Sequence, residues 1–176
     1  MANACSSSFI ATSDAEPWLT ASAIVAPVVS GSHILRIDGY SRTKGLGNGK
    51  FIASETFTVG GHRWCLRYYP DGRLLTDYDW ISILVQCDHS AVVDEVKASF
   101  RISLLDQDGD PVPSYSHEST NRIFSSRQDT MGFDIIKRSD LEASDCLRDD
   151  VFSVRCNLTV AKEIYSQPLP VSQVRR

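Results

Sequence analysis

Histidine and cysteine are the side chains with the widest chemical reach in this sequence, so their spacing is the first guide to any reactive site. The four histidines lie far apart, and none has a further ligand at metal-binding spacing: His33, His62, His89 and His117. The five cysteines are equally scattered and form no CxxC pair: Cys5, Cys65, Cys87, Cys146 and Cys156. The sequence predicts no metal site and no disulfide framework, and it predicts reduced cysteines in a cytoplasmic or nuclear protein.

Three other stretches are rich in oxygen atoms or glycine, but none meets the requirements of a known site. Asp106–Asp110 presents oxygens at alternate positions, yet a calcium loop needs glycine where Pro111 stands and glutamate where His117 stands. A hairpin turn is predicted there instead. Gly39–Lys50 lacks the glycine spacing of both nucleotide-binding fingerprints, which predicts a loop. Asp149-Asp150 has no acid or base partner, so we expect no enzyme activity, no catalytic residue and no cofactor.

The composition favours a single globular domain with ragged ends. The chain has 176 residues and a net charge of −4, from 18 basic and 22 acidic side chains. The basic residues form no stripe, so nucleic acid is not an expected partner. The apolar run at 21–29 is too short to span a membrane. Residues 1–20 are rich in serine and alanine and are predicted to be disordered.

Short strands with alternating apolar residues dominate the rest of the chain. In the stretch 57–72, two apolar runs flank Gly60-Gly61 and predict a hairpin. The predicted strands cover residues 33–38, 51–59, 62–69, 80–87, 96–105, 131–136 and 151–160, with a shorter strand at 122–124. Residues 111–130 contain two prolines and many Ser, Thr and Asn, which predicts an irregular connection.

A capping box predicts the only helix. Ser139 would cap its first turn, and Glu142 would return to the backbone N–H of the cap. The helix is expected to end near Ala143-Ser144. Seven or eight short strands, with no alternation of strands and helices, predict an antiparallel sandwich. The predicted fold class is therefore all-β, with one short helix near 139–144.

Several sequence blocks occur in an order typical of one protein family. They are FTVGGHRWCLRYYPDG at 57–72, DWIS at 79–82, FRISLLDQDG at 100–109, MGF at 131–133, IKRSDLE at 136–142 and DDVFSVRCNLTV at 149–160. Together they resemble the MATH domain, in particular the MATH half of plant BTB/POZ-MATH proteins related to the speckle-type POZ protein. The resemblance covers roughly residues 21–163.

The resemblance implies an eight-stranded, TRAF-C-like sandwich over residues 21–163, followed by a linker or tail at 164–176 without a BTB domain. In this family the MATH domain is not an enzyme. It holds short, extended, Ser/Thr-rich peptides of substrate proteins in a shallow groove, by strand addition and side-chain pockets. A following BTB domain binds a cullin scaffold, so that the captured protein is ubiquitinated. Cullin would therefore be an indirect partner, and only where a BTB domain is supplied.

The resemblance also assigns the positions of the groove. They fall on Leu84, Phe100, Arg122 (with one residue of alignment slack), Asp129, Thr130, Met131, Gly132 and Phe133. Gly132 and Phe133 match the family pattern, whereas Met131 replaces a tryptophan, Leu84 a tyrosine and Asp129 a lysine. Because Trp and Tyr often dominate binding energy, a groove is predicted but not the relatives' peptide preference. From strand alternation alone, Phe100 and Phe133 are expected to pack in the core.

Two other hypotheses about function remain open. The chain could associate with itself or with other MATH-BTB proteins, as a structural or interaction protein without a role in ubiquitination. It has no heptad run, so a coiled-coil trimer is not expected. An enzyme is the weakest alternative. The chain is expected to be either the recognition half of a MATH-BTB protein or a stand-alone MATH protein that competes for targets.

Overall fold

A computed structural model describes residues 18–88, 95–126 and 129–174 of the chain. The chain divides into two units, Pro27–Lys162 and the segments on either side of that range. The residues predicted to be disordered therefore lie mostly outside the described part. Each unit is described separately.

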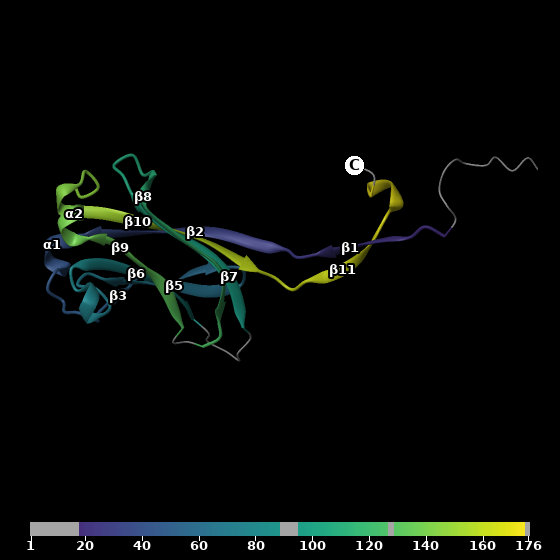
Figure 1. Cartoon of the computed structure of the whole chain (residues 1–176), viewed down its shortest axis with the longest axis horizontal. Helices are drawn as coiled ribbons and strands as arrows, with labels where there is room; N and C mark the ends of the chain where they lie inside the picture. The colour runs from purple at the N-terminus through teal and green to yellow at the C-terminus, as the bar shows by residue number, and fades with distance from the viewer. Residues whose placement is uncertain (1–17, 89–94, 127–128, 175–176) are drawn as a thin grey trace, which may run out of the picture. The chain divides into compact units, whose positions relative to one another are not determined.

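The larger unit contains two antiparallel sheets (Figure 1). The first has four strands in the order β2 (Val28–Asp38), β10 (Val151–Ala161), β7 (Val96–Leu105) and β8 (Pro111–Phe124). The second has five: β3 (Ile52–Ala53), β5 (His62–Tyr69), β6 (Trp80–Asp88) and β9 (Thr130–Lys137) in that order, with β4 (Phe57–Val59) also paired to β5. The all-β antiparallel sandwich predicted from the sequence is confirmed.

The smaller unit contains a sheet of two antiparallel strands, β1 (Ala21–Val25) and β11 (Tyr165–Leu169). A short 3₁₀ turn, Val171–Gln173, follows β11. The segment at 164–176 was predicted as a linker or tail, and its described part contains this strand and turn. The proline residues of the segment do not prevent pairing, because an edge strand donates hydrogen bonds on one side only.

The helix predicted near 139–144 is present as α2 (Arg138–Ala143), but the capping box is wrong. Ser139 lies inside the helix, and no side chain caps its start. Glu142 instead accepts a hydrogen bond of 3.0 Å from the hydroxyl of Tyr40 and pairs with the ammonium group of Lys44. These two partners direct the carboxylate toward α1 and not back to the backbone of its own helix.

A second helical turn, α1 (Tyr40–Thr43), lies in the stretch predicted as a loop. Asp150 stabilises its start, because its carboxylate accepts hydrogen bonds from the Ser41 N–H at 2.8 Å and the Ser41 hydroxyl at 2.7 Å. The capping group comes from a distant part of the chain, so no local sequence pattern could predict this turn. A 3₁₀ turn, Leu75–Asp77, also lies between predicted strands.

The prediction of an irregular connection at 111–130 is wrong for residues 111–124, which form β8, and the short strand predicted at 122–124 is the end of it. Within the described residues β8 pairs only with β7, so it is an edge strand that can accommodate its prolines. The β7–β8 register shifts twice, between Ala98 and Phe100 and between Ser103 and Leu105. These irregularities break the alternation that would otherwise have revealed the strand.

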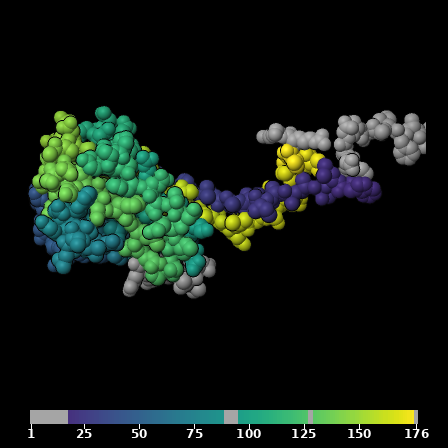
Figure 2. Space-filling view, in the orientation of Figure 1, coloured from purple at the N-terminus to yellow at the C-terminus, as the bar shows by residue number. Residues whose placement is uncertain are grey.

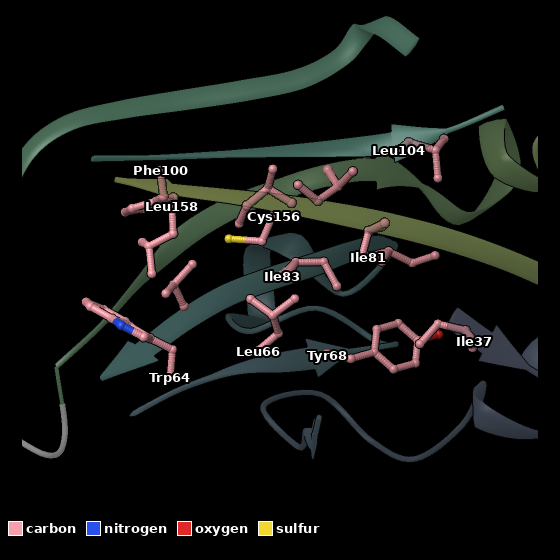
Figure 3. Packing of buried hydrophobic residues seen from close by; sticks show 14 of the residues in the cluster. Ile37, Trp64, Leu66, Tyr68, Ile81, Ile83, Phe100, Leu104, Cys156 and Leu158 are labelled. Carbon is pink, nitrogen blue, oxygen red and sulfur yellow. The ribbon is translucent and has the colours of Figure 1, made fainter. Parts of the chain in front are cut away.

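The core lies between the two sheets and follows the predicted alternation (Figure 3). β6 contributes Ile81, Ile83, Val85 and Cys87, and β10 contributes Phe152, Val154, Cys156, Leu158 and Val160. The hairpin at 57–72 supplies Trp64, which is fully buried and donates its indole N–H to the Val59 carbonyl at 3.1 Å.

The four described cysteines are buried and free, and burial raises the pKa of Cys87 and Cys156 to about 12. These thiols therefore serve as packing groups.

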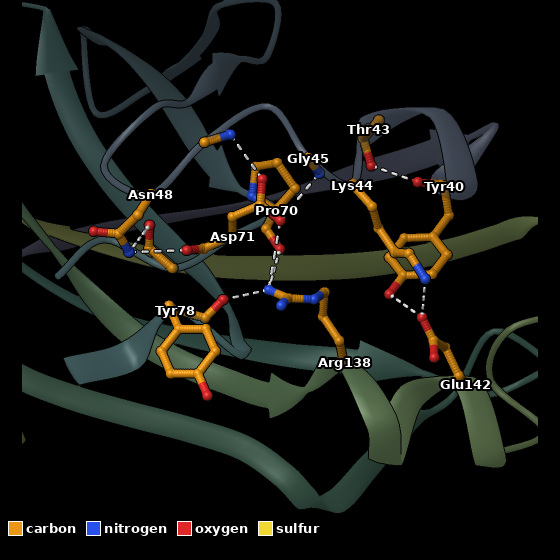
Figure 4. A network of polar contacts seen from close by, with 12 residues as sticks. Tyr40, Thr43, Lys44, Gly45, Asn48, Pro70, Asp71, Tyr78, Arg138 and Glu142 are labelled. Atoms are coloured by element: carbon orange, nitrogen blue, oxygen red, sulfur yellow. Dashed lines mark hydrogen bonds and ion pairs between the residues drawn. The ribbon is translucent and has the colours of Figure 1, made fainter. Parts of the chain in front are cut away.

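A network of polar contacts joins α2 to the neighbouring loops (Figure 4). Arg138 donates hydrogen bonds to the carbonyl oxygens of Pro70 and Tyr78 and lies 3.5 Å from the carboxylate of Asp71. The same carboxylate accepts the Gly47 N–H at 2.8 Å. Since both charged side chains are mostly buried, they hold the glycine-rich loop and the 70–79 connection against the start of α2.

Candidate functional site

The predicted groove residues of β9 lie on opposite faces of this strand, because successive side chains alternate. Met131 and Phe133 pair with the inward-facing Val85 and Ile83 of β6 and pack against the core. Thr130 and Gly132 pair with residues of the opposite face of β6. The structure therefore separates the predicted residues into an inner and an outer group.

The inner group centres on Phe133. Its ring lies 5.8 Å from that of Phe100, and Phe100 itself is only 2% exposed on β7. Phe133 and Met131 remain partly exposed while they contact the core. Phe100 therefore acts as the floor beneath Phe133, and the two β9 side chains are the ones that solvent or a ligand can reach.

His117 of β8 completes this inner group and was not predicted as a site residue. Its ring stacks on Phe133 at a centroid distance of 5.3 Å and an interplanar angle of 27°. The Nε2 atom of His117 is buried, and no described residue forms a hydrogen bond with it. An unsatisfied buried polar atom is costly, so this histidine marks the place where the surface is not optimised for stability alone.

We name the partly buried residues that β8 and β9 place here the β8–β9 strip. It consists of Tyr115, His117 and Ser119 of β8 and Met131 and Phe133 of β9. The three β8 residues occupy alternate positions, and Ser119 pairs with the inward-facing Phe100. In Figure 2 the teal and green surfaces of this part of the chain adjoin one another. The strip combines aromatic area with the polar atoms of its three β8 side chains.

Arg122 lies on the same face of β8 as the strip, because it pairs with the inward-facing Ala98. The register shifts between the Ser119–Phe100 and Arg122–Ala98 pairs, and this shift keeps Arg122 on the same face. Asn121, within the shift, has a φ of 53° and donates its backbone N–H to the Ser99 hydroxyl at 3.0 Å. The Arg122 side chain is exposed. It therefore adds a positive charge next to the strip without packing in it.

The outer group behaves differently. Leu84 is only 2% exposed, so a ligand cannot reach its side chain in this structure. Gly132 lies directly opposite, where a Cβ atom would come within 2.0 Å of the Ile83 carbonyl oxygen and 2.6 Å of the Leu84 Cα. Gly132 is thus required by the close approach of β9 to β6, whatever its part in binding.

Asp129 holds the turn that precedes β9. Its carboxylate accepts hydrogen bonds from the backbone N–H groups of Ser125 and Ser126, at 2.6 and 2.9 Å, and from the Ser125 hydroxyl. These donors stabilise the charged form and hold the pKa of Asp129 below its ordinary value. The negative charge of Asp129 therefore has a structural role.

We expect acidification to loosen this turn. A lowered pKa means that the contribution of Asp129 to stability is complete above its ordinary pKa of 3.8 and is lost as the pH falls through the lowered value. An NMR titration of the Asp129 carboxyl carbon, with the Ser125 and Ser126 amide signals, tests this. Asp129→Asn provides the control, since its amide signals should not titrate with this group. A midpoint at or above 3.8 for Asp129 would contradict the expectation.

β9 is also the last strand of its sheet, and within the described residues it pairs only with β6. An extended peptide could add to its open edge through backbone hydrogen bonds. Alternate side chains of that peptide would point toward the β8–β9 strip and toward the outer face near Thr130. The arrangement therefore offers both elements of strand addition, an open edge and a row of side chains for specificity.

Part of this site could not be read from the sequence, because only residues 122–124 of β8 were predicted as a strand. Tyr115, His117 and Ser119 do recur at every second position, which is the period of a strand. The surrounding prolines and small polar residues obscured that signal.

Among the described residues, no three His, Cys, Asp or Glu side chains gather in a metal-binding arrangement. The helices of the described part are too short and too polar to span a membrane.

Comparisons with known proteins identify the family. Residues 32–158, more than half of the chain, match the model of the MATH domain. The chain is 38% identical over 152 residues to BTB/POZ and MATH domain-containing protein 4 of Arabidopsis thaliana, covering 82% of this chain and 32% of that protein. Protein 5 of the same series is 36% identical over 149 residues, covering 80% of this chain and 36% of that protein.

The chain thus spans about a third of the length of these curated relatives. Among solved structures, Notothenia coriiceps TRAF5 superposes with a TM-score of 0.57 and 18% identity, covering 73% of this chain and 72% of that one, which supports the fold alone. The sandwich, the sequence match and the plant relatives agree with one another. The chain belongs to the MATH domain family, and its curated relatives are BTB/POZ-MATH proteins.

Proposed function

We propose that this MATH domain binds extended, Ser/Thr-rich peptide segments of target proteins by strand addition to β9, with specificity from the β8–β9 strip. MATH domains are protein-interaction modules rather than enzymes, and this chain is homologous to BTB/POZ-MATH proteins. The observation that carries the proposal is the unpaired edge of β9 beside partly exposed Phe133 and the unsatisfied Nε2 of His117. Stability alone would favour a paired strand edge, a fully buried ring and a hydrogen-bonded nitrogen.

We further propose that the binding event selects substrates for a cullin-based ubiquitin ligase. The relatives' names pair the MATH domain with a BTB/POZ domain. Cullin would bind through that second domain, so its recruitment depends on a BTB domain being supplied in the same or an associated chain. The buried free cysteines suit a reducing compartment, and we place the protein in the cytoplasm or nucleus.

Selection from a displayed library of short random peptides tests the binding proposal. The full chain should enrich extended sequences with Ser or Thr at alternate positions. Amide NMR shifts on adding an enriched peptide should then concentrate on Thr130–Lys137 and on the strip residues of β8. If no sequence is enriched, or if the shifts map to the outer face of β2 and β10, the proposed site is wrong.

A further inference from the structure

The β1–β11 ribbon, defined as Ala21–Val25 paired with Tyr165–Leu169, is a sheet of only two strands. Figures 1 and 2 show its purple and yellow strands side by side. A sheet of two strands is at best marginally stable in water, and three or more strands are usually needed. Since no other described strand pairs with the ribbon, each of its strands keeps one open edge.

Pro168 prevents another strand from pairing with the free edge of β11. Pro168 lies opposite Ser22 in the ribbon. A proline within a sheet is placed with its ring nitrogen facing away from the neighbouring strand, because that nitrogen has no hydrogen to donate. The proline ring therefore occupies the open edge of β11, where it removes a donor and blocks the approach of another strand.

The open edge of β1 has no such protection. Antiparallel strands alternate between hydrogen-bonded and non-hydrogen-bonded pairs. Placing Ser22 and Pro168 in a non-hydrogen-bonded pair directs the N–H and C=O groups of Ser22 and Ile24 outward, to the open edge. The strand sequence ASAIV contains no charge and no proline, and the side chain of Ile24 is 74% exposed. This edge is ready to accept another uncharged strand.

We propose that β1 pairs antiparallel with β1 of a second copy of this chain, so that two ribbons join into one continuous sheet with a β11 strand at each outer edge. A two-fold axis beside Ala23 places Ser22 opposite the partner's Ile24, and the reverse. Each of these two pairs exchanges two hydrogen bonds, since both residues present outward backbone groups. The two Ile24 side chains become diagonal neighbours on one face and bury apolar area.

Self-pairing suits this edge better than an acidic or basic partner does. Neither β1 nor β11 carries a charged residue, so two copies meet without like-charge repulsion and a charged strand gains nothing. The symmetric arrangement also leaves only proline-protected edges on the outside, which stops growth at two copies. The dimer uses no residue of the β8–β9 strip, so its test does not depend on whether the strip binds peptides.

Sedimentation equilibrium of the full chain tests the dimer, with a micromolar dissociation constant expected. Ile24→Pro removes an outward N–H and should raise that constant at least about tenfold. Ser166→Pro is the matched control, because it makes the same change on the outer edge of β11 and should leave the constant unchanged. A chain that stays monomeric, or one whose constant responds equally to both variants, overturns the proposal.

A covalent trap checks the register without relying on proline variants. Under the proposed two-fold axis, Ala23 faces the partner's Ala23 in a non-hydrogen-bonded pair, where Cα atoms lie about 4.5 Å apart and a disulfide can form. Ala23→Cys should therefore give an inter-chain disulfide under mild oxidation, and Gln167→Cys on β11 should not. The described native cysteines are buried and should remain unreactive. Failure of Ala23→Cys to cross-link overturns the assigned register.

Discussion

Replacing Gly132 with alanine is expected to lower the free energy of unfolding by about 3 kcal/mol, at the upper end of the usual cost of overpacking. The added Cβ would lie 2.0 Å from the Ile83 carbonyl oxygen and 2.6 Å from the Leu84 Cα. Both are backbone atoms of β6, so no flexible side chain can move aside. β9 must shift away from β6, which weakens the hydrogen bonds that join the two strands.

Gly109→Ala gives the matched control for this variant. It makes the same chemical change at a φ of +83°, where no atom lies within 4 Å of the added Cβ, so only the left-handed backbone is strained. That strain costs about 1 kcal/mol. Urea unfolding of both variants gives the comparison. Equal losses would show that the approach of β9 to β6 does not constrain position 132.

The contacts at position 132 also affect the proposed binding edge. Gly132 lies within the segment that the resemblance assigns to the groove, so loss of binding in Gly132→Ala would be easy to misinterpret. The contacts of its Cβ are with β6 and not with a ligand. A binding defect in this variant therefore reports on the position of β9 and on the alignment of its open edge.

The central strands could be predicted because their sequence alternation reflects a real difference between two faces. β10 alternates Phe152, Val154 and Cys156 toward the core with polar residues on the other face, and the structure follows that pattern. Only the last three residues of β8, 122–124, were predicted as a strand, because two register shifts interrupt the alternation of the rest. α1 could not be predicted for another reason: the side chain that caps its start belongs to Asp150, which is distant in sequence. Local patterns fail where pairing or capping is supplied from elsewhere in the fold.

The site shows the same division between local and long-range information. The resemblance assigns Met131 and Phe133 to the groove, and strand alternation then fixes which face they share. It did not locate His117, because that residue joins the site only through the meeting of β8 with β9. Leu84 illustrates the opposite case: its strand position was predicted, but its burial on the outer face could not be.

Phe133→Ala is expected to weaken binding of a library-selected peptide about a hundredfold, the loss typical of an aromatic hot spot. Phe133 is the strip residue whose ring contacts two others: it stacks on His117 and lies tilted against Phe100. Its removal deletes apolar contact area and leaves the His117 ring unsupported. Calorimetric titration of the full chain measures the loss.

Stability must be separated from binding in this variant. Because Phe133 is partly exposed, its truncation should cost less than the roughly 3–5 kcal/mol of a fully buried phenylalanine. Ile123→Ala serves as the control on β8: its side chain is 45% exposed and pairs with Lys97, on the face away from the strip. This variant should bind as the wild type does. If both variants bind equally well, the strip is not the peptide site.

A double-mutant cycle shows whether His117 and Phe133 bind the peptide as a coupled pair or as two independent contacts. His117→Ala alone should weaken binding about tenfold, since it removes the polar atom and one face of the ring stack. The double variant should lose less than the sum of the two single losses, because each single change already disrupts the stack that positions the other ring. A coupling free energy of about 0.5–1.5 kcal/mol is expected for such an aromatic pair. Strict additivity would mean that His117 and Phe133 bind the peptide separately, and that their stacking contributes only to the stability of the fold.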